Sequence, residues 1–130
     1  MSGTKYTRDH QWIRGGRSDG ALVVGITAFA AAQLGEIVSV ELPPAGSRLE
    51  RGEEAAVLES LKSVVGVPMP VTGVIVAVND VLAQQPELLN DDAIGRGWLL
   101  EVRPETPAVP AEWLDERDYL AWIEDPVREA

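Results

Sequence analysis

Lys62 is the residue in this sequence whose type and setting most clearly suggest chemistry. The eleven basic residues include only two lysines, Lys5 and Lys62. A lysine amine can form an amide or a Schiff base, whereas an arginine guanidinium does not. Lys62 stands in the segment Leu58-Glu59-Ser60-Leu61-Lys62-Ser63-Val64, with short strands predicted on both sides of it. This arrangement predicts a hairpin with an exposed lysine at its tip, a suitable attachment point for a covalently bound, swinging prosthetic arm.

The remaining reactive residue types argue against an enzyme. The chain has no cysteine and a single histidine, His10. Disulfides, thiolate nucleophiles, Cys-based metal sites and multi-His metal sites are therefore excluded. No Gly-rich phosphate-binding loop is present, and the Asp and Glu residues form no defined acid–base pair. We expect a non-catalytic protein, either a carrier or a plain interaction module with an unused lysine.

Charge and hydropathy restrict the partners. The formal net charge is -10, which disfavours binding to nucleic acids or to anionic membranes. No apolar run approaches the roughly 18 residues needed to span a membrane, and the N-terminus lacks the apolar core of a signal peptide. We expect a cytoplasmic protein with one domain over residues 1–130.

The first third of the chain predicts two strands and a helix. Residues 11–14 and 21–26 have strand character and are separated by a Gly-rich turn at 15–20. Residues 28–34 predict a short helix, with Thr27 as its N-cap and Gly35 as the residue after its end.

The rest of the chain predicts short strands followed by a helix. Residues 36–79 alternate apolar and polar positions between turn signals, and Pro68 and Pro70 place one strand at a sheet edge. Residues 86–89 predict a helical turn and residues 98–102 a strand. Prolines 104, 107 and 110 predict an extended connector. Residues 111–125 predict an amphipathic helix. Its apolar stripe, expected to face the core, comprises Trp113, Leu114, Leu120, Ala121 and Ile123.

Many ordered segments resemble one family. The sequence is similar to the H protein of the glycine cleavage system from about residue 6 to residue 125. The attachment segment Glu59-Ser60-Leu61-Lys62 is among the matches. The other matching segments are residues 6–13, 24–30, 33–38, 40–46, 70–73, 78–80, 86–90 and 97–99. The resemblance implies a mainly β fold with short helices (α+β), a flattened lipoyl-carrier β-barrel of the barrel-sandwich type with a C-terminal helix.

The resemblance also implies a cofactor and its site. Lipoic acid would be amide-linked to Lys62, and Glu59 and Ser60 would help the lipoylating enzyme to recognise the hairpin. Biotin carriers have a similar scaffold, but their lysine typically lies between methionines, whereas Lys62 lies between Leu61 and Ser63. In the family, the loaded arm folds back into a protective cleft. His10, Gln11 and Gly66 are the candidate residues of that cleft.

Two positions depart from the family pattern and bear on the cargo. The family usually has Glu where this chain has Gln11, and Asp where it has Gly66. Both changes remove negative charge from the place where a cationic aminomethyl group would be held. This pattern favours a sulfur-based cargo and a lipoate-binding protein of sulfur oxidation that works with a heterodisulfide-reductase-like complex. The alternative is a glycine cleavage H protein that serves the decarboxylase, the aminomethyltransferase and dihydrolipoyl dehydrogenase.

Overall fold

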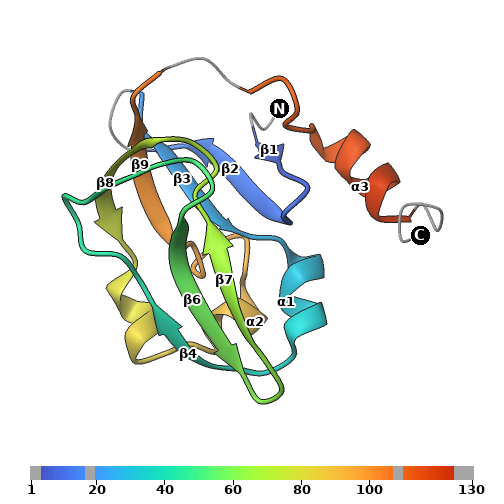
Figure 1. Ribbon diagram of the computed structural model, residues 1–130. Coiled ribbons are helices and arrows are strands. Elements are labelled where there is room, and N and C mark those ends of the chain that lie inside the picture. The colour runs from blue at the N-terminus through green and yellow to red at the C-terminus, as the bar shows by residue number, and fades with distance from the viewer. Residues whose placement is uncertain (1–3, 17–19, 107–109, 125–130) are drawn as a thin grey trace.

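Two antiparallel sheets form the body of the protein. The computed structural model describes residues 4–16, 20–106 and 110–124 (Figure 1). One sheet has the strand order β1-β2-β3-β9-β8-β5, and the other has the order β4-β6-β7. The strands are β1 (Lys5–Tyr6), β2 (Gln11–Gly15), β3 (Leu22–Ile26), β4 (Ile37–Glu41), β5 (Arg48–Leu49), β6 (Glu54–Ser60), β7 (Val64–Pro68), β8 (Gly73–Val78) and β9 (Leu100–Pro104). The helices are α1 (Ala28–Leu34), η1 (Asp80–Ala83), α2 (Leu88–Asp91) and α3 (Glu116–Glu124).

The core lies between the two sheets. Val24 and Val102 contribute to it from the six-stranded sheet, and Leu58 and Val67 contribute from the three-stranded sheet. Burying this apolar cluster between the sheets is the main favourable contribution to folding. The predicted mainly β fold with short helices is therefore confirmed. The sheets do not close into a complete barrel and form a flattened sandwich of the barrel type.

The local predictions around α1 and the hairpin agree with the structure. Thr27 accepts a hydrogen bond from the Ala30 backbone N–H at the start of α1, and Gly35 follows its last residue with a φ of 79°. A left-handed φ of this kind suits glycine because it has no Cβ. The hairpin of β6 and β7 carries Lys62 in its turn, and β7 lies at the edge of its sheet, as Pro68 requires.

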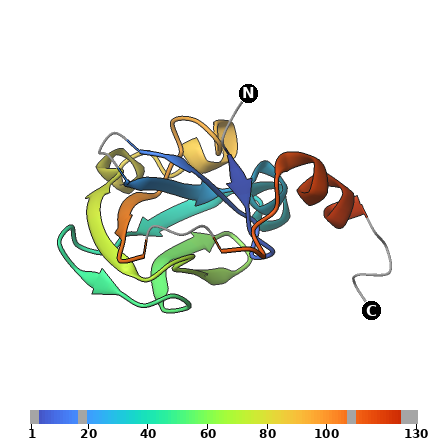
Figure 2. The ribbon, with the colours of Figure 1, turned by 90° about the horizontal axis from the view of Figure 1, so that it is seen from above.

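The C-terminal helix differs from its prediction. Helix α3 begins at Glu116 rather than at residue 111, because Leu114 pairs with Tyr6 as a β-bridge and the Asp115 carboxylate accepts from the Asp118 N–H. The predicted stripe does not form: Trp113 is buried outside the helix, and Leu120 is 45% exposed. Tyr119 is instead the buried residue of the helix. Figures 1 and 2 show α3 at the side of the molecule, near β1.

Two further predictions need correction or fall outside the description. The strand expected at residues 98–102 is β9, which begins at Leu100 and extends to Pro104. Pro104 thus pairs with Gly73 as the last strand residue and is not part of the connector. A strand end tolerates proline because no further ladder bond is needed from its nitrogen. Pro107, residues 17–19 of the Gly-rich turn and residue 125 lie outside the described residues.

Trp12 is the large buried side chain on β2, and its packing requires glycine on the neighbouring strand. Its indole Nε1 donates to the Ala93 carbonyl oxygen at 2.9 Å. A Cβ on Gly25 would lie 2.4 Å from Cζ2 of the indole ring. The ring thus lies flat against the backbone of β3, which fixes where β3 leads into α1.

We predict that Gly25→Ala lowers the free energy of unfolding by about 1–3 kcal/mol, the usual cost of overpacking a core. The matched control is Gly15→Ala on β2, where an added Cβ meets nothing within 4 Å. We expect the control to change stability by less than about 0.5 kcal/mol. Chemical denaturation of both variants measures the difference, and equal stabilities would contradict the close packing of Trp12.

Candidate functional site: the lysine hairpin and its cleft

Ser60 organises the turn that presents Lys62. Its hydroxyl oxygen accepts from the backbone N–H groups of Lys62 (3.3 Å) and Ser63 (3.1 Å). Its own backbone N–H donates to the Ser63 carbonyl oxygen at 2.8 Å. Ser60 is 5% exposed, so these bonds are largely shielded from water. The serine of the predicted attachment motif therefore shapes the turn itself, while Glu59 is exposed beside it on β6.

The tip of the hairpin is bound to the loop between α1 and β4. The Leu61 N–H donates to the Glu36 carbonyl oxygen at 3.1 Å. The side chain of Asn90 on α2 bonds to both ends of that loop. Its Nδ2 donates to the Gly35 carbonyl oxygen at 2.7 Å, and its Oδ1 accepts from the Ile37 N–H at 2.9 Å. These bonds tie the base of the hairpin tip to the α1–β4 loop and to α2.

Lys62 is exposed, and its stem lies beside the end of α1. A Cβ on Gly35 would lie 3.7 Å from the lysine Cε, an ordinary contact distance. Its neighbours are open to solvent: Leu61 is 74% exposed and Val64 is 64% exposed. An exposed amine in a stationary turn is accessible to a modifying enzyme, and its position against α1 directs an attached group toward that helix.

A cleft of about 430 Å³ lies between α1 and the edge strand β7. This is the size range of small-ligand sites, and most of its lining is apolar. Asp9 and His10 are the charged or ionisable residues that line it. The other lining residues are Ile26, Phe29, Ala30, Gln33, Leu34, Leu58, Val65, Gly66, Val67 and Pro68. Such a cleft suits a hydrocarbon chain with sulfur atoms at its end.

His10 is held at the wall of the cleft by α3. Its Nδ1 shares a hydrogen bond of 2.8 Å with the Tyr119 hydroxyl, which is also 2.8 Å from Thr27 Oγ1. Its ring lies 4.8 Å from that of Phe29 and 5.1 Å from that of Trp122, between centroids. The φ of His10 is 65°, a left-handed conformation that is uncommon outside glycine. These contacts hold the residue in that conformation.

Gln11 is not among the residues that line this cleft, although its neighbour His10 and its partner Pro68 are. The side chain is 1% exposed, and its amide donates to the Pro68 carbonyl oxygen while its Oε1 accepts from the Thr7 hydroxyl. The amide therefore connects β2 of one sheet to β7 of the other. A carboxylate could not donate to the Pro68 carbonyl oxygen. This contact therefore explains why residue 11 is an amide, independently of any cargo.

Gly66 does line the cleft, and the space that its side chain would occupy is filled. A Cβ on Gly66 would lie 2.4 Å from Oε1 of Glu54 and 3.0 Å from its Cδ. The carboxylate of Glu54 on β6 therefore lies over β7 at this position. The exposed Glu54 side chain thus fills the space beside Gly66, although Glu54 does not line the cleft.

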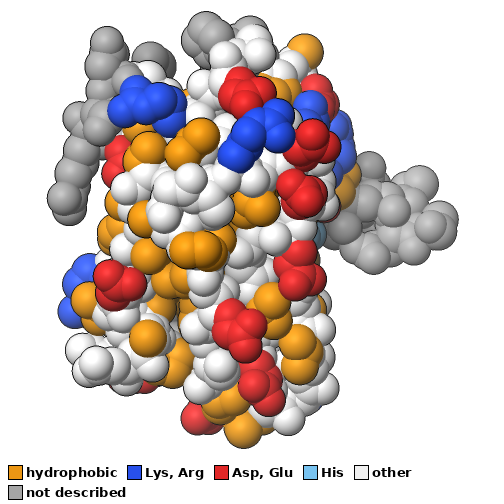
Figure 3. Space-filling model, turned by 60° about the vertical axis from the view of Figure 1, so that its left-hand side comes forward, with side chains coloured by type: hydrophobic (Ala, Val, Ile, Leu, Met, Phe, Trp, Pro, Cys, Tyr) orange, Lys and Arg blue, Asp and Glu red, His pale blue; other side chains and the backbone are white. Residues whose placement is uncertain are grey.

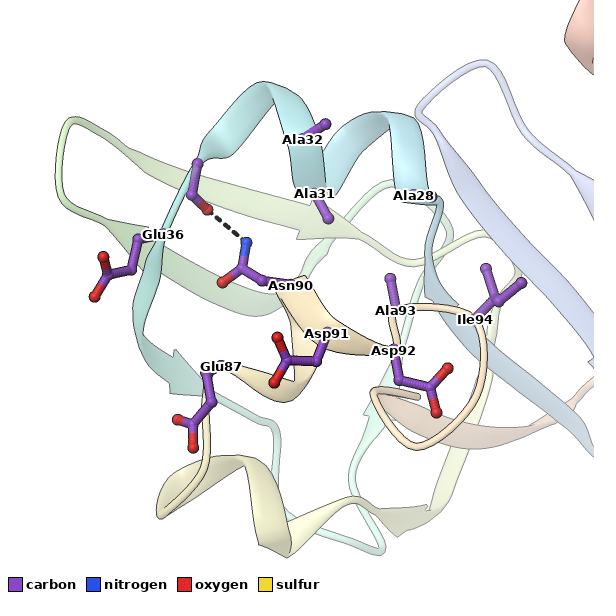
Figure 4. A pocket seen from close by; sticks show the side chains of 11 residues that line it. Ala28, Ala31, Ala32, Glu36, Glu87, Asn90, Asp91, Asp92, Ala93 and Ile94 are labelled. Atoms are coloured by element: carbon purple, nitrogen blue, oxygen red, sulfur yellow. Dashed lines mark hydrogen bonds between the residues drawn. The ribbon is translucent and has the colours of Figure 1, made fainter.

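A second, larger depression of about 770 Å³ lies on the opposite face of α1 (Figure 4). Its floor is formed by small side chains such as Ala28, Ala31 and Ala93, and carboxylates of Glu36, Glu87, Asp91 and Asp92 stand around it. Asn90 reaches across it to Gly35 (Figure 4). This depression is acidic and lacks large apolar side chains except Ile94, so it suits a hydrocarbon chain less well than the smaller cleft does.

Acidic and basic side chains are unevenly distributed over the face of the molecule in Figure 3. In Figure 3 the lower part of the visible face shows mainly acidic and hydrophobic side chains, while most of the basic side chains lie toward the upper end. Among the described residues, no group of three or more potential ligands could hold a metal ion. No helix in the described part of the chain is long and apolar enough to cross a membrane. A cytoplasmic location stays a prediction.

Comparison with known proteins identifies the family. The family model described as "Glycine cleavage H-protein" matches residues 4–126. The chain belongs to the glycine cleavage H-protein family. The glycine cleavage system H protein of Beijerinckia indica is 48% identical over 123 residues, covering 95% of this chain and 98% of that protein. That of Magnetococcus marinus is 44% identical over 119 residues, covering 92% and 84%.

A solved structure extends the similarity to three dimensions. The crystal structure of a glycine cleavage system H protein from Mycobacterium marinum superposes with a TM-score of 0.85 at 35% identity, covering 96% of this chain and 99% of that chain. Members of this family are non-catalytic lipoyl carriers, as predicted. The comparisons favour the glycine cleavage alternative over sulfur oxidation, which none of these matches supports.

Sequence reasoning did not select three residues that shape this site: Asn90, Tyr119 and Glu54. Asn90 falls in the segment 86–90 that resembles the family, which was the available signal. Tyr119 had no such signal, because its partner His10 is 109 residues away in the sequence. Glu54 meets Gly66 across the predicted hairpin, where the pairing of its two strands was the available signal.

We predict that Asn90→Ala lowers the free energy of unfolding by about 1–2 kcal/mol, because two backbone groups of the α1–β4 loop lose their partner. We also expect faster amide hydrogen exchange at Leu61, whose acceptor Glu36 lies in that loop. Exchange measured by NMR, with Asp91→Ala as the control on the same helix, tests this. Unchanged exchange at Leu61 would show that Asn90 does not hold the tip.

Proposed function

We propose that Lys62 carries an amide-linked lipoyl group and that this arm moves an aminomethyl group among the enzymes of the glycine cleavage system. The observation that carries the proposal is the exposed Lys62 in a hydrogen-bonded turn beside the end of α1, the helix that forms one wall of the apolar cleft. The bound group would supply a dithiol that forms and releases a carbon–sulfur bond. The chain would supply the folded scaffold, the attachment point at Lys62 (the tether) and the cleft that covers the arm between transfers (the shelter).

The tether and the shelter have separate structural bases. Ser60 and the Leu61–Glu36 bond keep the base of the arm stationary, so that movement is confined to the arm. A tethered cargo meets each partner at a high effective concentration. The cleft offers Phe29, Leu34 and Val67 as apolar contacts for the arm between transfers. Excluding water there would slow loss of the cargo.

The identity of the cargo is inferred from the family and from the surroundings of Gln11 and Gly66, the two positions that differ from the family pattern. Relatives that cover nearly the whole chain are named glycine cleavage system H proteins. Gln11 is engaged with Pro68, and the position at Gly66 is filled by the Glu54 carboxylate. Gln11 does not line the cleft, so the two substitutions do not lie together at one cargo site. The charge pattern at these two positions therefore does not favour a sulfur-based cargo.

Partners follow from the same proposal. A lipoylating enzyme would load Lys62, with Glu59 and Ser60 in the segment that it recognises. The decarboxylase, the aminomethyltransferase and dihydrolipoyl dehydrogenase would then act on the attached arm in turn. With a net charge of -10, docking surfaces of opposite charge on those enzymes would speed association, and added salt would weaken this effect.

We predict that protein made in a lipoylation-competent host shows one lipoyl adduct in its intact mass. Lys62→Arg should abolish the adduct, because a guanidinium does not accept the amide linkage. Lys5→Arg, the other lysine, is the matched control and should keep it. An unmodified Lys62, or an adduct that survives Lys62→Arg, would overturn the attachment site.

We predict that the lipoylated protein supports glycine decarboxylation and cleavage when mixed with the three partner enzymes, measured as release of CO₂ from glycine. Protein carrying Lys62→Arg should give only the rate seen without any carrier. A lipoylated protein that fails to support the reaction would leave the carrier role standing but refute the glycine cleavage assignment.

A further inference from the structure

Two exposed apolar side chains flank Lys62 at the tip of the β6–β7 hairpin, which projects from one end of the molecule in Figure 1. Leu61 is 74% exposed and Val64 is 64% exposed, whereas the other exposed large hydrophobic residues of the described chain range from 36% to 53%. Scattered exposed apolar residues are normal on a soluble protein. These two are not scattered, because they lie on either side of the same lysine.

The fold does not require either side chain to be apolar. Leu61 contributes its backbone N–H to the bond with Glu36, and Val64 begins β7 in register with Glu59. Neither side chain belongs to the core cluster or lines the cleft. A polar residue at position 61 would make the same backbone bond, and threonine suits a strand about as well as valine does. A reason for the apolar type must therefore lie outside the folded chain.

The chemistry at Lys62 indicates what approaches these side chains. A lipoylating enzyme transfers a lipoyl group from an acyl adenylate to the lysine amine. The amide bond forms as the bond from the carbonyl carbon to the phosphate oxygen breaks, AMP leaves, and the neutral amine loses one proton. The amine is only one side-chain length from the backbone, so the enzyme must close around the hairpin tip. Enzymes that act on the far end of the finished arm have no such need.

We propose that Leu61 and Val64 form an apolar docking surface for the lipoylating enzyme and enter an apolar recess around its active-site entrance. This inference rests on the proposed attachment of lipoate to Lys62, but it is independent of the cargo. Glu36 and Glu59 are exposed beside the tip, so basic groups at the rim of that recess would complement them. The docking surface thus brackets the amine that the enzyme must reach.

The test measures initial rates of lipoylation with a purified ATP-dependent lipoate ligase, lipoate and ATP. Intact mass follows the adduct as the concentration of unlipoylated protein is varied. We expect Leu61→Gln and Val64→Thr each to raise KM for the protein about threefold to tenfold, the effect of losing part of a buried apolar contact. The value of kcat should change little, because a docking contact is present in both the ground state and the transition state. Leu61→Met keeps the side chain apolar and should keep the original KM.

Matched controls make the same exchanges at other exposed apolar positions. Val81→Thr lies on η1 and Leu120→Gln on α3, and the two side chains are 48% and 45% exposed. Both controls should leave KM unchanged. An equal rise of KM in the controls would show that the enzyme responds to surface hydrophobicity in general, and the proposal would be wrong.

Amide hydrogen exchange distinguishes docking from a change in the turn. The N–H groups of Lys62 and Ser63 donate to the Ser60 hydroxyl oxygen, so their exchange rates report whether the turn is intact. We expect the same rates in all variants. Faster exchange in Leu61→Gln and Val64→Thr would mean that these substitutions act through the turn, and the apolar contact would be refuted.

Two other occupants of this surface would give different results. If a second copy of the chain covered it, the unmodified sequence would sediment as a dimer and Leu61→Gln as a monomer. If the decarboxylase covered it, Leu61→Gln would raise KM in glycine decarboxylation and leave lipoylation unchanged. Either result would overturn the assignment to the lipoylating enzyme.

The outcomes also separate this inference from the proposed function. If the unmodified sequence acquires no lipoyl group on Lys62, the proposed function fails. If it is lipoylated and both Leu61→Gln and Val64→Thr are lipoylated with unchanged KM, the proposed function stands and the docking surface is refuted.

Discussion

The connection between the hairpin tip and the α1–β4 loop determines where Lys62 can act. One backbone hydrogen bond, from Leu61 to Glu36, joins the tip to a loop that Asn90 holds from α2. The lysine stem then lies beside Gly35, at the end of the helix that forms one wall of the cleft. Without this connection, a hairpin tip of exposed residues would move independently of the cleft. The tether and the shelter are thus parts of one arrangement around α1.

Helix α3 contributes to the same arrangement from the other end of α1. Tyr119 contacts both His10 and Thr27, the N-cap of α1, through its hydroxyl group. Its ring stacks on that of Tyr6, at a centroid distance of 4.9 Å. Burial raises the pKa of the Tyr6 phenol above its ordinary value, with a smaller contribution from Glu116. The phenol therefore remains neutral in this aromatic cluster. The C-terminal helix stabilises the cleft wall although most of its own surface is exposed.

Residues 11 and 66 show that the role of a position depends on its three-dimensional surroundings as well as on its residue type. Residue 66 carries no acid, yet a carboxylate from Glu54 lies where its side chain would be. Residue 11 carries an amide whose donor group is needed by the Pro68 carbonyl oxygen. Comparing single positions with a family pattern counts two lost charges. In three dimensions, Gln11 makes a structural hydrogen bond to Pro68, and the exposed Glu54 side chain fills the space beside Gly66.

The sequence by itself determined the features that depend on neighbours along the chain. These are the bounds of α1 with its Thr27 cap, the hairpin around Lys62, the edge position of Pro68 and, through ordered motifs, the family. Tertiary structure decided the features that depend on distant partners. Leu114 pairs with Tyr6 and delays the start of α3, and Tyr119 replaces the predicted apolar stripe. The hydrogen bond from Gln11 to Pro68, which joins the two sheets, has the same cause. Periodicity and capping are local, whereas these contacts join residues that only the packing of two sheets and a C-terminal helix brings together.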